Sequence, residues 1–195
     1  MPTGVAIRDA RQQLFDAAER VLLRDGPSGL TSRAVTAEAG VAKGVLHRHF
    51  ADFDAFLAEL ALDHIARINA QAAALRECAG TSTVAGNLTG ALTELLGSLA
   101  PALVSLIIFR DDLRARLRQT GAGRVPVASE ATAMIASYLA AEQDLGRIAA
   151  GADIGTLAPT LIGAVHLLSA ERKGAAPDAG EVRKIVTAVI AGIEH

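Results

Sequence analysis

The sequence predicts an all-α protein of about nine helices, a three-helix N-terminal head followed by a larger helical body. Apolar residues recur every three or four positions along most of the 195 residues, the period of a helix with one buried face. Glycine and proline clusters interrupt this pattern at intervals of a helix length. No stretch alternates apolar and polar residues as a half-buried strand would. We expect the head to comprise residues 1–51 and the body residues 52–195.

The first helix of the head is expected from Arg8 to Arg24. Its apolar residues form one buried stripe: Leu14, Phe15, Ala18, Val21 and Leu22. The segment 25–29, Asp-Gly-Pro-Ser-Gly, then ends the helix because glycine and proline interrupt helical geometry.

Residues 31–50 predict two short helices joined by a glycine turn. Thr31 can cap the first helix, and Gly40 falls where that helix should end. The apolar pattern resumes at Val41, and we expect the head to share one core: Leu14, Val21, Leu30, Val35, Leu46 and Phe50. Two helices with a short turn form a helix-turn-helix, which places its second helix in the major groove of DNA.

The outward residues of this motif are candidate DNA contacts. Lys43 and His49 suit phosphates, Gly44 allows a close backbone approach, and Arg48, Val45 and His47 suit base edges. Thr31, Ser32 and Arg33 start the preceding helix and could hold another phosphate. Alternatively, Lys43 and Arg48 are ordinary solvated side chains. Residues 1–50 carry seven Lys/Arg against five Asp/Glu, or +2, and residues 51–195 carry twelve against sixteen, or −4.

The head resembles the helix-turn-helix domain of the tetracycline-repressor (TetR) family of transcriptional regulators over residues 8–60. The similarity rests on Leu30-Thr31, Val35, Ala39-Gly40-Val41, Lys43-Gly44, Leu46, His49-Phe50 and the run from Asp52 to Leu57. Two residues depart from the family pattern: Ala42 replaces a capping serine, and His47 replaces a phosphate-contacting tyrosine. The resemblance implies a DNA-binding regulator, most simply a repressor, that acts as a dimer on a palindromic operator.

The body is expected to form helices over 52–78, 83–99, 101–119, 129–145, 153–171 and 178–194. The breaks fall at Gly80, at Pro101 and in the segments 121–126, 146–151 and 174–180. Within 101–119, Asp112 and Arg116 are four residues apart and can pair. No apolar run is long enough to span a membrane, and no signal pattern starts the chain, so a cytoplasmic location is expected.

The last two helices are apolar on more than one face. They either fill the core of one chain or bury themselves against a second copy. In TetR-like proteins such a pair forms a four-helix dimer interface, which the resemblance also implies here. The candidate interface residues are Leu161, Val165, Leu168, Val182, Val186, Val189 and Ile190.

The resemblance further implies a small-molecule cavity in the body, without a cofactor. We expect an apolar cavity lined by 52–78, 101–119 and 129–145, for a lipophilic or weakly polar ligand. The candidate lining residues are His64, Ile68, Phe109, Arg110, Met134 and Tyr138.

Two other classes of function are alternatives to a regulator. The chain has no glycine-rich phosphate loop, no paired zinc-binding histidines on one helix face and no nucleophile elbow, which argues against an enzyme. His47 and His49 lie two apart and would point in different directions on a helix, so we expect no metal site. Ala42 and His47 leave open a helical interaction or ligand-binding protein whose head no longer binds DNA.

Overall fold

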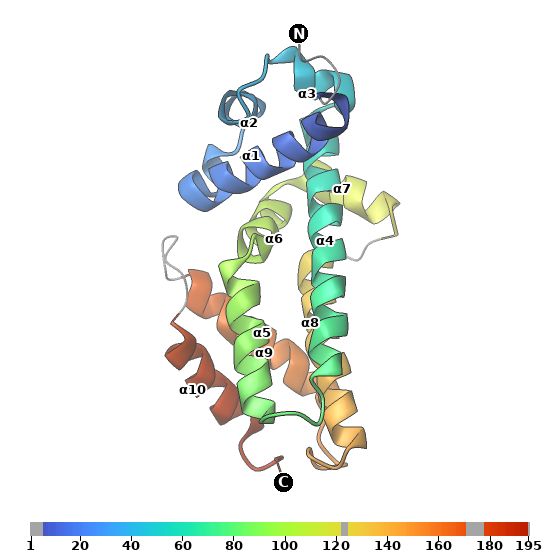
Figure 1. Cartoon of the computed structure of the whole chain (residues 1–195), viewed down its shortest axis with the longest axis vertical. Coiled ribbons are helices and arrows are strands. Elements are labelled where there is room, and N and C mark those ends of the chain that lie inside the picture. Colours follow the sequence, from blue (N-terminus) through green and yellow to red (C-terminus); the bar gives the residue numbers. More distant parts are fainter. Residues whose placement is uncertain (1–5, 122–124, 171–177, 195) are drawn as a thin grey trace. The chain divides into compact units, whose positions relative to one another are not determined.

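The computed structural model describes residues 6–121, 125–170 and 178–194, and these residues are predominantly helical (Figure 1). The ten helices in these ranges are α1 (Ala6–Gly29), α2 (Ser32–Glu38), α3 (Gly44–His49), α4 (Phe53–Glu77), α5 (Val84–Gly97), α6 (Ala100–Phe109), α7 (Asp111–Gln119), α8 (Pro126–Asp144), α9 (Ile154–Ala170) and α10 (Ala179–Ile190). Within the described ranges there is no strand, and Ile148 and Glu194 form an isolated backbone bridge. The all-α prediction is confirmed.

Two compact units make up the chain. The first contains Met1–Asp63 and Ala102–Val125, and the second contains His64–Pro101 and Pro126–His195. The predicted division at residue 51 falls between α3 and α4, whereas the first unit also includes the start of α4 and all of α7. The predicted boundary between a DNA-binding head and a regulatory body at residue 51 therefore stays a prediction. Two of the predicted breaks, 121–126 and 174–180, fall partly outside the described residues.

One predicted helix is two helices in the structure. The expected helix at 101–119 is broken at Arg110, whose backbone is extended (φ −119°, ψ 100°). Asp111 and Asp112 then occupy the first turn of α7, where negative charge is stabilised by the helix dipole. This break accounts for a tenth helix, and the acidic pair is the signal of a new N-terminus in the sequence.

The core of the first unit contains the predicted head residues. All six are at most 3% exposed. Four phenylalanines extend this core, because Phe50 packs edge-to-face on Phe56 at 5.0 Å, and Phe15 and Phe53 lie within 5.6 and 5.7 Å of Phe56. The first helix is interrupted where expected, since Gly26 has a positive φ of 71° and Pro27 follows it, and a short helical segment continues to Gly29. The aromatic cluster joins α1, the end of α3 and the start of α4 into one packed body.

The second unit is a helical bundle around α5. This helix packs on α8, α9 and α10, and α9 also packs on α8 and α10. Its core is aliphatic and includes Leu88, Leu92, Ile135, Leu139, Leu161, Val165, Val182, Val186 and Ile190. Thr83 caps α5 by accepting from the Gly86 amide at 3.0 Å, and Asp178 caps α10 through the Gly180 amide at 2.9 Å.

No single helix in the described ranges is long and apolar enough to span a membrane. Helices α5 and α6 would meet this criterion of length and composition only if taken together.

A buried polar cluster lies near the C-terminal end of α8. The Tyr138 hydroxyl donates to Glu142 Oε1 at 2.5 Å and accepts from the Asn87 amide at 3.0 Å. The other Glu142 oxygen accepts from the Gly80 amide at 3.2 Å and lies 3.3 Å from Arg147 Nη1. Both Tyr138 and Glu142 are fully buried. Burial, and then the hydrogen bond to Glu142, raise the pKa of Tyr138 well above its ordinary value of 10.0.

The raised pKa of Tyr138 predicts a loss of stability at alkaline pH. Because the folded chain favours the neutral phenol, this stabilisation is complete below pH 10.0 and declines as pH rises toward the folded-state pKa. The chain has one tyrosine and no tryptophan, so phenolate absorbance reports this group alone. We expect the native phenol to stay protonated at a pH that ionises the urea-denatured chain. Identical native and denatured titration curves would contradict this prediction.

Candidate nucleic-acid interface

The turn between α2 and α3 is defined by local hydrogen bonds. Thr31 has extended backbone, and its hydroxyl accepts from the Ala34 amide at 3.1 Å, so it caps α2 as predicted. Gly40 has a φ of 66°, which a residue with a Cβ rarely adopts. The amides of Gly40 and Val41 donate back to the carbonyls of Ala37 and Thr36 at 3.1 and 3.0 Å. This double closure ends α2 and redirects the chain into α3.

Helix α3 has one buried side and one exposed side. Leu46 is fully buried and Phe50 is 3% exposed, which anchors α3 to the head. Lys43, His47 and Arg48 are exposed on the other side. Lys43 occupies the N-cap position of α3 and makes no side-chain capping hydrogen bond.

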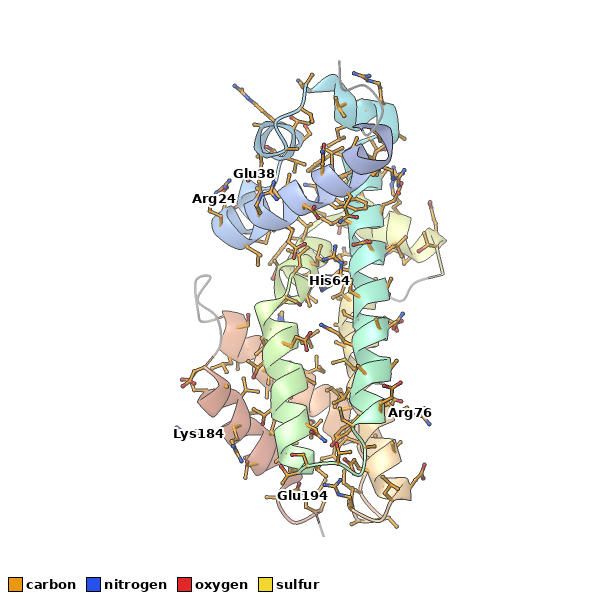
Figure 2. The ribbon with its side chains drawn as sticks, viewed as in Figure 1. Arg24, Glu38, His64, Arg76, Lys184 and Glu194 are labelled. Carbon is orange, nitrogen blue, oxygen red and sulfur yellow. The ribbon has the colours of Figure 1, made fainter. Side chains whose placement is uncertain are left out.

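An ion-pair network joins α1 to α2. Arg20 Nε and Arg24 Nη1 each donate to one oxygen of Glu38 at 2.8 Å. Figure 2 labels Arg24 and Glu38. Arg24 also pairs with Asp25 at 2.9 Å. The hydrogen bonds from Arg20 and then Arg24 hold the pKa of Glu38 below its usual range, so this carboxylate stays charged. The network was missed at the sequence level because its partners are 14 and 18 residues apart.

The cations of the head whose side chains are described fall into two groups. On α1, Arg11, Arg20 and Arg24 are neutralised by Glu59, Glu38 and Asp25. On the helix-turn-helix, Arg33 and Arg48 are exposed and make no side-chain hydrogen bond or ion pair with any other described residue. The same holds for Lys43 and His47. Uncompensated positive charge is therefore concentrated on α2, the turn and α3, which suits a polyanion.

None of the predicted DNA-contact residues is buried. Thr31, Arg33, Lys43, Gly44, His47 and Arg48 are exposed, and Ser32, Val45 and His49 are half-buried. Because the Thr31 hydroxyl already caps α2, Arg33 is the better phosphate donor at this end of the motif. The structure thus leaves the predicted contact surface accessible.

A further ion pair joins the start of α4 to α7 within the first unit. Asp52 accepts from the Ala55 amide at 2.7 Å and so caps α4, and it also pairs with Arg116 at 2.6 Å. The hydrogen bond from the Ala55 amide is the largest cause of the lowered pKa of Asp52; burial opposes it, and the Arg116 charge adds to the lowering. The predicted pairing of Arg116 with Asp112 is wrong, because the Arg116 guanidinium pairs with Asp52 instead.

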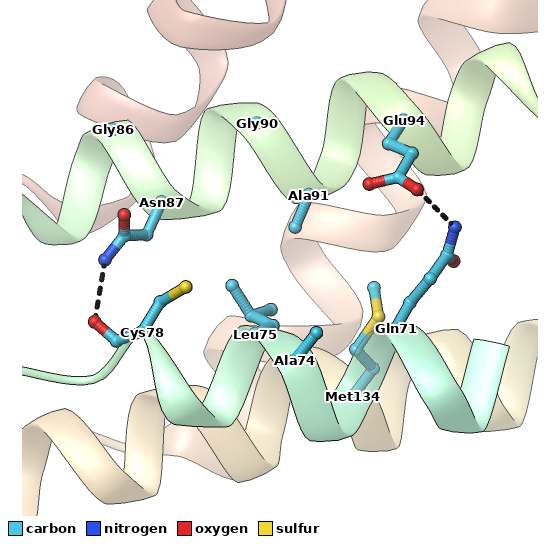
Figure 3. A pocket seen from close by; sticks show the side chains of 10 residues that line it. All are labelled: Gln71, Ala74, Leu75, Cys78, Gly86, Asn87, Gly90, Ala91, Glu94 and Met134. Carbon is cyan, nitrogen blue, oxygen red and sulfur yellow. Dashed lines mark hydrogen bonds between the residues drawn. The ribbon is translucent and has the colours of Figure 1, made fainter.

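The second unit contains a pocket of about 330 Å³ between α4 and α5 (Figure 3). Its described lining residues are Gln71, Ala74, Leu75 and Cys78 on and just after α4, Gly86, Asn87, Gly90, Ala91 and Glu94 on α5, and Met134 on α8. The predicted lining included the segment 101–119. In the structure no residue of that segment lines the pocket, and α5 supplies five of the lining residues.

Five of the six predicted pocket residues do not line this pocket. Met134 does. His64 and Ile68 are buried, and Tyr138 belongs to the polar cluster. Phe109 is 85% exposed, and the Arg110 guanidinium donates twice to Asp54 Oδ1, at 2.8 and 3.0 Å. Periodicity located polar and apolar positions on helices but could not show which helices surround the space.

The predicted dimer residues require a correction too. Five of them, Leu161, Val165, Val182, Val186 and Ile190, are at most 1% exposed and fill the chain's own core. Leu168 and Val189 are half-buried. The exposed side of α9 instead carries Gly155, Pro159, Gly163 and Leu167, four residues apart from one another. The sequence could not distinguish these two sides because both are largely free of charge.

Comparison with known proteins agrees with this geometry. Residues 14–60 match the family model of bacterial regulatory proteins of the TetR family. A TetR-family member from Streptomyces coelicolor is 27% identical, covering 93% of this chain and 98% of its own, with a TM-score of 0.61. The multidrug binding protein EbrR, complexed with imidazole, is 26% identical, with coverages of 92% and 94% and a TM-score of 0.57. FadR from Bacillus subtilis, complexed with stearoyl-CoA, is 15% identical, with coverages of 94% and 99% and a TM-score of 0.61. No curated protein sequence matches the chain.

The fold and the head are those of a helix-turn-helix transcriptional regulator. More specifically, residues 14–60 belong to the TetR family, and the chain as a whole has the fold of its members. That family consists of DNA-binding regulators rather than enzymes.

Proposed function

We propose that this protein is a transcriptional repressor that binds a palindromic operator as a homodimer and leaves it when a small molecule binds the body. The observation that carries the proposal is the accessible group of uncompensated cations on the helix-turn-helix, in contrast to the neutralised arginines of α1. Such a repressor would act in the cytoplasm, where its operator lies.

The DNA contacts follow from the exposed side of the motif. Helix α3 lies in the major groove, with Arg48 positioned for a guanine edge and Val45 for a thymine methyl group. Lys43 and Arg33 contact phosphates on either side and set the register of the head on the duplex. His47, in place of the usual tyrosine, donates to a phosphate or a base edge.

The dimer uses the exposed sides of α9 and α10. On α9 the stripe formed by Gly155, Pro159, Gly163 and Leu167 presents little charge and small side chains, which allow close helix packing. Leu167 is 63% exposed in the single chain, a large apolar side chain that a second copy would cover. Two-fold symmetry then matches the two halves of a palindrome.

Ligand control follows from differential affinity. EbrR and FadR hold ligands as different as imidazole and stearoyl-CoA on a similar fold, which supports a small-molecule site in this body without identifying the ligand. A ligand that binds better to the DNA-free conformation weakens operator binding by the ratio of its two affinities.

The proposal predicts specific, salt-dependent binding to DNA from the protein's own promoter. Each Lys or Arg that neutralises a phosphate adds about 0.9 to the slope of log affinity against log salt concentration. If each head neutralises three phosphates, a dimer loses roughly a thousandfold in affinity between 50 and 200 mM salt. Gel-shift titrations at several salt concentrations measure the slope, and sedimentation gives the number of chains per duplex.

Random DNA of equal length serves as the control for this measurement. The proposed function requires two chains per duplex and a preference for the promoter over random DNA by at least about a thousandfold. Equal binding to both DNAs, or none to either, would instead favour a helical interaction protein with a degenerate head.

A further inference from the structure

We propose that the pocket between α4 and α5 binds a small organic cation with an apolar body, and that Glu94 is its counter-ion. The proposal deepens the proposed function by naming the chemical class of the ligand. Its binding step does not depend on DNA and can be tested alone.

The space in the pocket comes from the side of α5 that faces it. Three of its residues have minimal side chains: Gly86 and Gly90, which lie four positions apart on one helical face, and Ala91, which follows Gly90. A Cβ added at Gly90 would meet no atom within 4 Å. Glycine costs about 1 kcal/mol relative to alanine inside a helix. The space at Gly90 is therefore maintained at some cost to helix stability.

The electrostatic character of the pocket is negative. Glu94 is exposed, and it is the one carboxylate among the ten described lining residues, which include no lysine, arginine or histidine. Its Oε1 accepts from the Gln71 amide at 2.8 Å, across the pocket from α4 (Figure 3). This hydrogen bond fixes the carboxylate at one end of the space and leaves its other oxygen for a ligand. An anionic ligand would have no positive partner there.

The rest of the lining offers few polar contacts. Leu75 and Met134 are buried and present aliphatic and thioether surface, and Ala74 and Ala91 add small apolar groups. At the far end, the Asn87 amide already donates to the carbonyls of Cys78 and Thr81 at 3.1 and 3.0 Å. A ligand with charge at the Glu94 end and an apolar body toward Met134 therefore matches the pocket. A methionine thioether also packs well against an aromatic ring.

The test compares three probes that share one apolar body: phenylbutylammonium, phenylbutanol and phenylbutyrate. Cys78 is the only cysteine of the chain, is exposed and lines the pocket, so the rate of its reaction with a thiol reagent reports occupancy without DNA. Calorimetry provides the affinities. We expect the ammonium to bind about three- to tenfold more tightly than the alcohol and the carboxylate to bind weakest.

Two variants separate the charge from the space. Glu94→Gln should make the affinities for ammonium and alcohol equal, whereas Glu77→Gln, at the exposed end of α4, should leave the difference intact. Gly90→Leu should fill the pocket and weaken both probes about tenfold or more. Gly97→Leu is the matched control, because its added Cβ also meets no atom within 4 Å but lies outside the lining.

Each outcome bears on a separate claim. Equal affinities for ammonium and alcohol in the unmodified protein would overturn the assignment of Glu94, and unchanged binding in Gly90→Leu would overturn the site. If the ammonium binds as expected and operator affinity does not change, the inference stands and the proposed release mechanism fails. If another ligand releases the operator and the ammonium never binds, the inference fails and the proposed function stands.

Discussion

Replacing Glu142 with alanine is expected to lower the free energy of unfolding by about 3–5 kcal/mol. The carboxylate is fully buried and accepts from the Tyr138 hydroxyl, the Gly80 amide and Arg147. Alanine would leave these three donors without their acceptor in a space too confined to hydrate them freely. It would also remove a bond between α8 and the segment that precedes α5. Urea denaturation followed by helical circular dichroism measures the loss.

Two matched substitutions define the origin of that loss. Glu142→Gln keeps an oxygen for the Tyr138 hydroxyl and should cost clearly less than alanine. Glu77→Ala removes an exposed carboxylate from the end of α4 and should change stability by no more than about 0.5 kcal/mol. A loss of under about 1 kcal/mol for Glu142→Ala would show that water replaces the carboxylate and that the cluster does not hold the helices together.

The head could be predicted closely because its determinants are local. Thr31 and Gly40 each direct the backbone within a few residues, through a cap and a left-handed turn, and the structure contains both. The six predicted core residues are buried because the helical period alone decides which side of a short helix is apolar. The break at Arg110 shows the limit of this reasoning, since the acidic residues after it signal a helix start that an apolar period does not reveal.

The body could be predicted as helices but not as surfaces. Helix α9 carries no Asp, Glu, Lys or Arg, so the sequence does not show which of its sides meets α5 and which meets solvent. The pocket depends on which helix packs opposite α4, and glycines at positions 86 and 90 become informative only when that partner is known to be α5. The partners of Arg110 and Arg116 lie 56 and 64 residues away, beyond the reach of any local rule.

Substitutions on the exposed side of the helix-turn-helix are expected to have the largest effect on DNA binding. Lys43→Ala should weaken binding to every DNA sequence by a similar factor and lower the salt slope by about one, because a phosphate contact carries no sequence information. Arg48→Ala should weaken operator binding by about ten- to a hundredfold and remove the preference at one base position. Binding to a set of operators mutated at single positions, measured at two salt concentrations, distinguishes the two effects.

The neutralised arginines of α1 provide the control for this prediction. Arg20→Ala also removes one positive charge from the head, but that charge is already bound to Glu38. If binding depended only on the net charge of the head, all three variants would lose affinity equally. If DNA affinity depends on the accessible charge of the motif, Arg20→Ala should lose much less affinity than Lys43→Ala or Arg48→Ala. A uniform loss in Lys43→Ala and Arg48→Ala, with no change in base preference, would show that Arg48 contacts the backbone, and the base-reading residue would then have to be sought at Val45 or His47.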